Sequence, residues 1–161
     1  MPRKPLIVYY SLTGNTKLIA EAIKGVIDAD ILALKPVKEL NPEKSSRYFW
    51  GGYQANMKKK PKLEPFDINP LDYDLIFLGF PVWSWTFSPP TRTFITKYDL
   101  NGKNVALWSC SQGGTEKALN KIKIELKGAN IIGTLNMIEP LKNPEESKKK
   151  AVEWAQHMIS L

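Results

Sequence analysis

The sequence predicts an α/β fold, a doubly wound, five-stranded parallel sheet with helices on both faces. Short apolar runs alternate along the chain with longer segments whose apolar residues recur at helical spacing, a pattern typical of right-handed βαβ units. The first run, from Leu6 to Tyr10, is apolar at every position, as expected of a strand covered on both faces. Strands are expected at residues 6–10, 30–34, 75–80, 105–109 and 130–138.

The helices in the first half of the chain are predicted from the spacing of their apolar residues. Between Lys17 and Ile27 the apolar residues share one helical face, with charged residues on the other, which indicates an amphipathic helix. A second helical region is expected to begin near Pro42, but Gly51 and Gly52 lie within it and lower its helix propensity. The pattern therefore predicts helix only weakly at that point.

The later helices are predicted from their start signals. Ser88 followed by Pro89 provides an N-cap and a first-turn proline. Thr115 is suited to cap the next helix, and segment 143–146, which begins Asn-Pro, is a near-complete start signal for the last one. That last helix is expected to run to the end of the chain.

The turn between the first strand and the first helix has the composition of a phosphate site. It consists of Ser11, Leu12, Thr13, Gly14, Asn15 and Thr16. Free backbone N–H groups and the positive end of the helix dipole meet at such a turn, and hydroxyl and amide side chains add donors. Gly14 allows the backbone to approach an anion closely. The alternative interpretation is that Thr13 or Asn15 only caps the helix and Gly14 only turns the chain.

Two further loops are expected at the same edge of the sheet, because ligands of such folds lie beyond the carboxyl ends of the strands. The loop after residues 75–80 begins Pro81, Val82, Trp83, Ser84, Trp85. Its large rings are suited to stacking on a planar ligand, and the alternative is that they pack as core. We expect core packing for Phe87, which follows in the same loop.

The loop after residues 105–109 is made of small residues. Ser109 is followed by Cys110, Ser111, Gln112, Gly113 and Gly114. Such residues allow close backbone approach to a flat ring. They are equally ordinary in a loop before a capped helix, where Cys110 is a small buried filler.

Taken in this order, the segments SLTGNTK, GFPVWSWTFSPP and WSCSQGGT resemble the three flavin mononucleotide (FMN) loops of the flavodoxins. The resemblance implies the strand order 2-1-3-4-5, with FMN where the strand order reverses. It implies that the first segment holds the phosphate, that Trp83 or Trp85 stacks on the isoalloxazine, and that backbone from Ser109 to Gly114 covers the pyrimidine edge. The implied cofactor-binding residues are Ser11, Leu12, Thr13, Gly14, Asn15, Thr16, Pro81, Val82, Trp83, Ser84, Trp85, Ser109, Cys110, Ser111, Gln112, Gly113 and Gly114.

The bulk properties of the chain restrict its class. Its 161 residues, of which 43% are hydrophobic, are expected to form one compact domain, residues 1–161. No apolar run approaches the length of a membrane span, and the first residues lack the pattern of a signal peptide. The single cysteine, Cys110, excludes an internal disulfide, so a cytoplasmic location is expected.

The chain is basic, with a formal net charge of +7. Familiar flavodoxins are acidic and dock on basic partners, so the opposite charge here favours acidic redox partner proteins. The basic residues are spread along the chain without a zinc, homeodomain or RNA-recognition signature. Nucleic-acid binding is therefore not supported.

The sequence lacks a conventional catalytic constellation: zinc-hydrolase, Rossmann and P-loop motifs are absent. The leading hypothesis is electron transfer between redox partners through non-covalently bound FMN. Residues 81–91 and 109–115 contain no acidic side chain, which predicts a raised potential for the second reduction step of the flavin. One alternative is a small FMN-dependent reductase that oxidises NAD(P)H with a quinone as acceptor. Another is a flavodoxin-like module without flavin that binds a partner.

Overall fold

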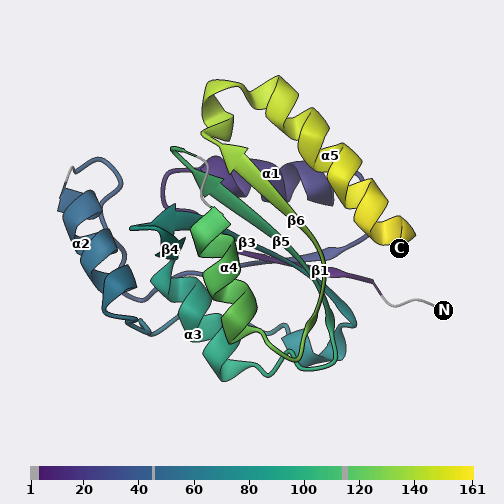
Figure 1. The fold of residues 1–161 in the computed structure, drawn as a ribbon, viewed down its shortest axis with the longest axis horizontal. Helices are drawn as coiled ribbons and strands as arrows, with labels where there is room; N and C mark the ends of the chain where they lie inside the picture. The colour runs from purple at the N-terminus through teal and green to yellow at the C-terminus, as the bar shows by residue number, and fades with distance from the viewer. Residues whose placement is uncertain (1–3, 45, 114–115) are drawn as a thin grey trace.

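The computed structural model describes residues 4–44, 46–113 and 116–161, and it contains a central sheet flanked by helices (Figure 1). The strands are β1 (Leu6–Tyr9), β2 (Asp30–Ala33), β3 (Leu75–Trp83), β4 (Thr86–Phe87), β5 (Asn104–Ser111) and β6 (Asn130–Ile138). The helices are α1 (Asn15–Lys24), α2 (Ser46–Asn56), α3 (Pro89–Lys97), α4 (Glu116–Glu125) and α5 (Pro144–Ser160), with 3-10 turns η1 (Pro70–Asp72) and η2 (Pro140–Lys142).

The parallel strands follow the order β2-β1-β3-β5-β6, which confirms the doubly wound sheet and the order 2-1-3-4-5. The expectation of five strands is wrong, because β4 pairs antiparallel with the end of β3 and makes the sheet six-stranded. The chain reverses between them at Ser84 and Trp85, whose φ angles are 52° and 64°. Positive φ at both central residues is the geometry of a two-residue hairpin turn. The turn could not be predicted from the sequence, because such turns usually contain glycine or asparagine, and Ser84 and Trp85 are neither.

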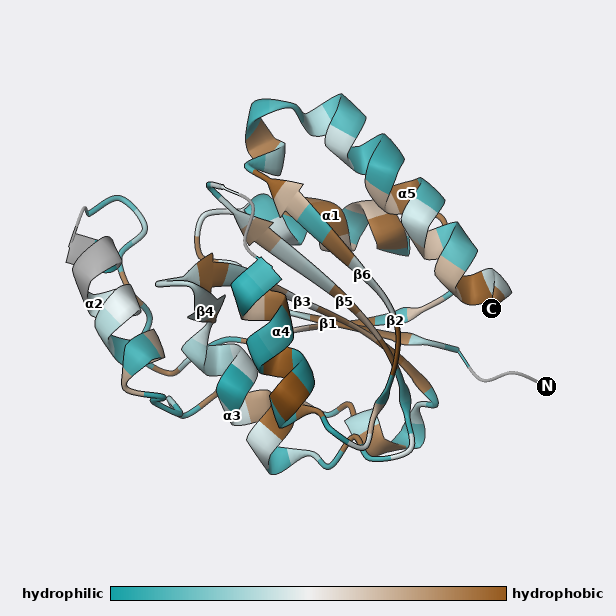
Figure 2. Cartoon of the chain, viewed as in Figure 1, coloured by the Kyte–Doolittle hydropathy of each residue, from teal (hydrophilic) through white to brown (hydrophobic). Residues whose placement is uncertain are grey.

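Successive residues of β1 face opposite sides of the sheet. Leu6 and Val8 belong to the core that includes residues of α3 and α4, whereas Ile7 and Tyr9 belong to the core that includes residues of α1 and α5. Both sets are buried, which explains why the strand is apolar at every position. In Figure 2 brown stretches lie along the strands of the sheet, while α4 and α5 carry both brown and teal residues.

The helix start signals are confirmed where the structure describes them. Ser88 and Asn143 are the N-cap residues of α3 and α5. Helix α2 forms despite its two glycines, and it begins at Ser46 rather than near Pro42. The expected cap Thr115 lies outside the described residues. Within the described ranges, no helix is both long and apolar enough to cross a bilayer.

The topology brings the three predicted loops together. Strands β1, β3 and β5 are neighbours and run parallel, so their carboxyl ends lie at the same edge of the sheet. Beyond β1 lies the turn from Ser11 to Gly14, beyond β5 the loop after Ser111, and β3 ends in the hairpin turn. Segments that are some thirty to a hundred residues apart in the chain (11–14, 84–85 and 112–113) therefore border one region.

Candidate functional site

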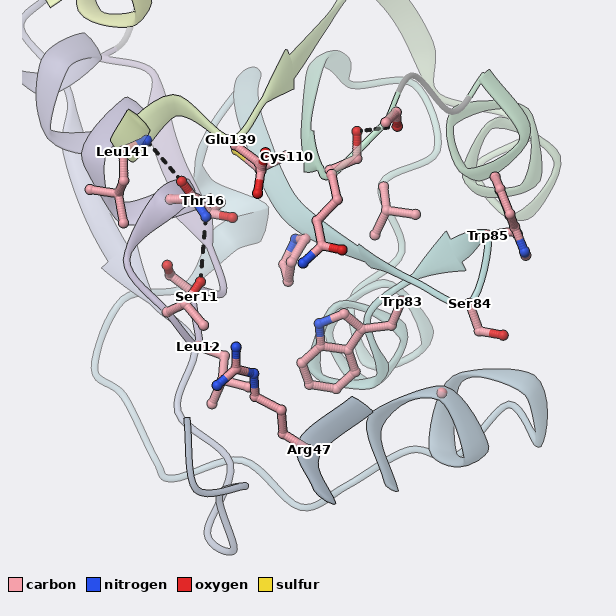
Figure 3. Close-up of a pocket in the computed structure, with 18 residues that line it drawn as sticks. Ser11, Leu12, Thr16, Arg47, Trp83, Ser84, Trp85, Cys110, Glu139 and Leu141 are labelled. Atoms are coloured by element: carbon pink, nitrogen blue, oxygen red, sulfur yellow. Dashed lines mark hydrogen bonds between the residues drawn. The ribbon is translucent and has the colours of Figure 1, made fainter. Parts of the chain in front are cut away.

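A cavity of about 530 Å³ opens at the carboxyl edge of the sheet (Figure 3). Its volume lies within the range of small-molecule sites. Its walls come from the turn after β1, helix α2, the β3–β4 hairpin, the end of β5 and the segment after β6. The lining residues are Ser11, Leu12, Thr13, Asn15, Thr16, Arg47, Gly52, Pro81, Val82, Trp83, Ser84, Trp85, Cys110, Ser111, Gln112, Gly113, Glu139 and Leu141.

Most of the residues predicted from the sequence line this cavity, and among the described residues Gly14 and Ser109 do not. Gly14 shapes the turn from behind, with φ 105° at the N-cap of α1. Ser109 is fully buried, and its Oγ donates to Asn136 Oδ1 on β6 at 3.0 Å. Gly114 lies outside the described residues. The Ser109 side chain therefore does not line the cavity, and the expectation that its backbone covers the edge of a ligand stays a prediction.

The turn after β1 is held in shape by its own polar groups. The Gly14 N–H donates to Ser11 Oγ at 3.1 Å, and Asn15 Nδ2 is 3.5 Å from Thr13 Oγ1. The left-handed conformation at Gly14 is one that a residue with a side chain rarely adopts. Helix α1 begins directly after it, with no acidic residue in its first turn. The positive end of the helix dipole therefore faces the cavity without a competing carboxylate from the helix itself.

The hydroxyl of Thr16 is the buried polar group in this wall that has no partner. Thr16 is 1% exposed, and its Oγ1 makes no hydrogen bond with any described residue. It lies near the Cys110 thiol. Burial raises the pKa of this thiol to about 12, and Thr16 has a smaller effect that lowers the pKa. That contact lacks hydrogen-bond geometry. Buried hydroxyls are normally satisfied, so this one is suited to donate to a polar group of a ligand in the cavity.

The two tryptophans of the hairpin differ in orientation. Trp83 presents its indole to the cavity, whereas Trp85 points away from it (Figure 3). Trp85 is 60% exposed, with the Lys117 ammonium 5.5 Å from the centroid of its ring. Of the two, Trp83 is therefore the one placed to stack on a bound ring. Phe87 is 1% exposed and packs in the core, as expected.

The end of β5 and the residues after it form a narrow, small-residue wall. Ser111 Oγ donates to the carbonyl of Gly113 at 2.6 Å, which holds the loop in a tight turn. A Cβ on Gly113 would have no atom within 4 Å. The absence of a side chain here is therefore not needed to avoid a clash, but it leaves the cavity wider. Cys110 is buried beside it, in line with its interpretation as a small filler.

Four lining residues were not predicted from the sequence. Arg47 and Gly52 come from α2, and Glu139 and Leu141 follow β6. Figure 3 shows the Arg47 guanidinium on the side of Leu12. No periodic or motif signal marks these positions, because α2 and the segment after β6 reach the cavity only through the tertiary fold.

Glu139 alters the electrostatic expectation for the site. The sequence predicted a site without carboxylates from its two later loops, and Glu139 brings one from a different segment. Its φ is 41°, and the Lys142 ammonium lies 3.0 Å from Glu139 Oε2. The ion pair partly neutralises this carboxylate. Among the described residues, no group of three or more metal-ligating side chains is present.

The fold and the cavity define a doubly wound α/β protein with a ligand site at the carboxyl edge of its sheet. The chain matches the flavodoxin family over residues 4–158, and it therefore belongs to that family. Among curated proteins, none matches the chain.

Solved structures share this fold. A flavoprotein from Lactobacillus acidophilus in complex with FMN is 26% identical, with a TM-score of 0.73 over 89% of this chain and 97% of its own. Oxidised flavodoxin 2 from Bacillus cereus is 23% identical, with a TM-score of 0.64 over 98% and 99%. The two-electron reduced flavodoxin from Megasphaera elsdenii is 24% identical, with a TM-score of 0.57 over 94% and 98%.

Proposed function

We propose that this protein binds FMN non-covalently in the cavity and transfers electrons between redox partner proteins. The observation on which the proposal chiefly rests is the Thr16 hydroxyl, which is buried at a helix N-terminus beside a donor-rich turn and makes no hydrogen bond with any described residue. That arrangement suits a phosphate group. Membership of the flavodoxin family, and the FMN complex of the related Lactobacillus acidophilus flavoprotein, support the same ligand.

The phosphate would be held by the turn from Ser11 to Thr16. Its donors are backbone N–H groups, the hydroxyls of Ser11, Thr13 and Thr16, and the Asn15 side-chain amide. A hydrogen bond to a charged group contributes roughly 1.5–3 kcal/mol, so several of them can hold a dianion without a lysine in the turn. The dipole of α1 adds to this attraction.

The isoalloxazine would lie against Trp83, with the backbone of residues 109–114 along its pyrimidine edge. The indole offers a flat apolar surface toward the cavity, and the small residues after β5 leave room for a ring. When bound, FMN supplies the one- and two-electron chemistry. The chain's own residues bind it, orient it and limit its contact with water.

The charge of the chain supports acidic partners. The formal net charge is +7, and Lys117 lies beside the exposed Trp85 at the edge of the cavity. Cationic and aromatic groups close to the cavity favour docking of an anionic surface near the flavin. The basic charge would also attract an anionic nicotinamide cofactor, which is the alternative in which the protein is a reductase of quinones.

Binding is tested with the purified protein, by visible absorbance and by titration with FMN and with riboflavin, which lacks the phosphate. We expect flavin absorption bands and a dissociation constant for FMN at least about 100-fold below that for riboflavin, equivalent to about 2.7 kcal/mol. Equal affinities would remove the phosphate site from the proposal. Protein that stays colourless with FMN would instead favour a flavin-less binding module.

Electron transfer is tested separately, by steady-state assays of the FMN-loaded protein. A carrier should accept electrons from a reductase and pass them on, with little oxidation of NADPH when only NADPH and a quinone are present. Sustained NADPH oxidation under those conditions would assign the reductase activity in place of the carrier role.

A further inference from the structure

We infer that Gly51 of helix α2 and Tyr10, the residue after strand β1, position the Trp83 indole as the wall against which a planar ligand stacks. Insofar as that ligand is FMN, the inference rests on the proposed function. It explains why a helix with poor helix-forming residues lies at this place. The glycine that weakens α2 is the residue that lets the helix approach the indole.

Gly51 is in close contact with Trp83. A Cβ built on Gly51 would lie 3.2 Å from Trp83 Cε3 and 3.3 Å from Cδ2, and 3.4 Å from Leu40 Cδ1. The two distances to the indole are shorter than ordinary van der Waals contact, so a side chain at Gly51 would require the indole or α2 to shift by a few tenths of an ångström. Glycine in a helix interior costs about 0.5–1 kcal/mol relative to alanine, which indicates that its small size is needed here.

The adjacent Gly52 differs in this respect. A Cβ on Gly52 would meet Ser84 Cβ at 3.6 Å, which is an ordinary contact. The two glycines have the same helix propensity and lie next to each other in α2, but of the two it is Gly51 that contacts the indole. They therefore form a matched pair in which the effect of a methyl group on Trp83 is separated from its effect on the helix.

Tyr10 holds the indole from a second direction. The two rings meet edge to face, with centroids 5.6 Å apart and planes at 85°. Tyr10 itself is 1% exposed, and its hydroxyl donates to Glu39 Oε1 at 2.7 Å. The same oxygen accepts the Leu40 N–H at 2.8 Å, so the segment that contacts Gly51 also anchors Tyr10.

These contacts leave the cavity as the open side of the indole. Trp83 lines the cavity, and it also contacts the buried Tyr10 ring and lies against Gly51 of α2. A methyl group at Gly51 would therefore move the indole toward the ligand or move α2 outward. Either shift changes the width of the slot in which a planar ring stacks.

The inference is tested by comparing Gly51→Ala with Gly52→Ala. We expect G51A to weaken FMN binding about tenfold, equivalent to about 1.4 kcal/mol, and to change the near-ultraviolet circular dichroism of the flavin-free protein. G52A should leave that spectrum unchanged, because its methyl group would meet Ser84 and not the indole. Equal spectra of the flavin-free G51A and G52A variants would overturn the inference.

A second substitution keeps the test decisive if G51A folds poorly. Trp83→Ala removes the ring that the new methyl group would meet, so G51A should have little further effect on folding or affinity in a W83A background. Failure of W83A to rescue a misfolded G51A would overturn the inference. If no variant, nor the unmodified protein, binds FMN, the proposed function fails, and the spectra of the flavin-free proteins still decide whether Gly51 positions the indole.

Discussion

The side-chain carbonyl of Asn15 accepts a hydrogen bond from the backbone N–H of Leu141 at 2.9 Å, which joins two segments 126 positions apart. Leu141 also packs against the turn, since its Cδ1 would lie 3.5 Å from a Cβ on Gly14. With its oxygen used in this way, the Asn15 amide keeps its N–H groups for the turn. The segment after β6 thus fixes the orientation of a donor in the candidate phosphate site.

This relationship predicts that Asn15→Asp separates folding from binding. Aspartate keeps the acceptor for Leu141 and places a negative charge at the start of α1, where it is favourable, so the empty protein should keep its stability. A phosphate would be repelled, and FMN affinity should fall by more than about tenfold. Thermal unfolding and FMN titration measure the two effects. Unchanged FMN affinity would contradict the assignment of the phosphate to this turn.

Thr16→Val should make the empty protein more stable and the binding weaker. Valine matches the shape of threonine and removes a buried hydroxyl without a partner, so we expect a gain of about 1 kcal/mol and a midpoint about 2–4 °C higher. Loss of a donor to the phosphate should weaken FMN about tenfold and leave riboflavin unaffected. Thr16→Ser, which keeps the hydroxyl, is the control and should bind FMN nearly as the native chain does.

Glu139→Gln should strengthen FMN binding. The change removes a negative charge from the cavity wall, and we expect about a threefold gain at low salt that fades as salt screens it. Lys142→Ala leaves the carboxylate without its ion-pair partner and should act in the opposite direction. Isothermal titration at two salt concentrations measures both. An E139Q variant that binds more weakly would show that this carboxylate contributes a hydrogen bond instead.

Cys110 should resist thiol reagents in the folded protein. Burial raises the pKa of its thiol to about 12, so the thiolate is scarce near pH 8, where an unfolded cysteine ionises readily. Reaction with an aromatic disulfide reagent should be roughly a thousandfold slower than in urea. Fast labelling of the native protein would mean that the β5 end opens in solution.

Tyr10→Phe should reduce the fall in the free energy of unfolding that occurs at alkaline pH. Burial, and then the hydrogen bond to Glu39, raise the pKa of Tyr10 above its ordinary value of 10.0, so the folded state keeps a proton that the unfolded chain loses. The free energy of unfolding therefore falls as the pH rises above about 10. At neutral pH the variant should be less stable by about 0.5–1.5 kcal/mol.

Urea unfolding at pH 7 and at pH 11 measures this difference. The gap between the two proteins should narrow at the higher pH, while Tyr9 and Tyr73, whose pKa values are also raised, titrate in both. A gap that stays constant would show that Tyr10 ionises equally in the folded and unfolded states.

The order of strands and helices, and the three loops at the sheet edge, could be predicted from the sequence alone. Apolar periodicity is a local property, because each strand or helix shows the pattern of its own buried faces. Strand β1 illustrates this, since all four of its residues are buried, and so do Ile19 and Ile23 of α1, which are buried as their spacing indicates. The position of the loops follows from the topology that these patterns imply.

Other features arise only when distant parts of the chain meet. In the sequence Gly51 only lowers the helix propensity of its segment, and its contact with Trp83, 32 positions later, is seen only in the structure. Arg47 and Glu139 line the cavity although the sequences of their own segments do not indicate it. The β3–β4 hairpin likewise requires positive φ at Ser84 and Trp85, which their residue types do not favour. Periodicity indicates which face of a helix or strand is buried. The residues that pack against that face are decided only when the whole chain folds.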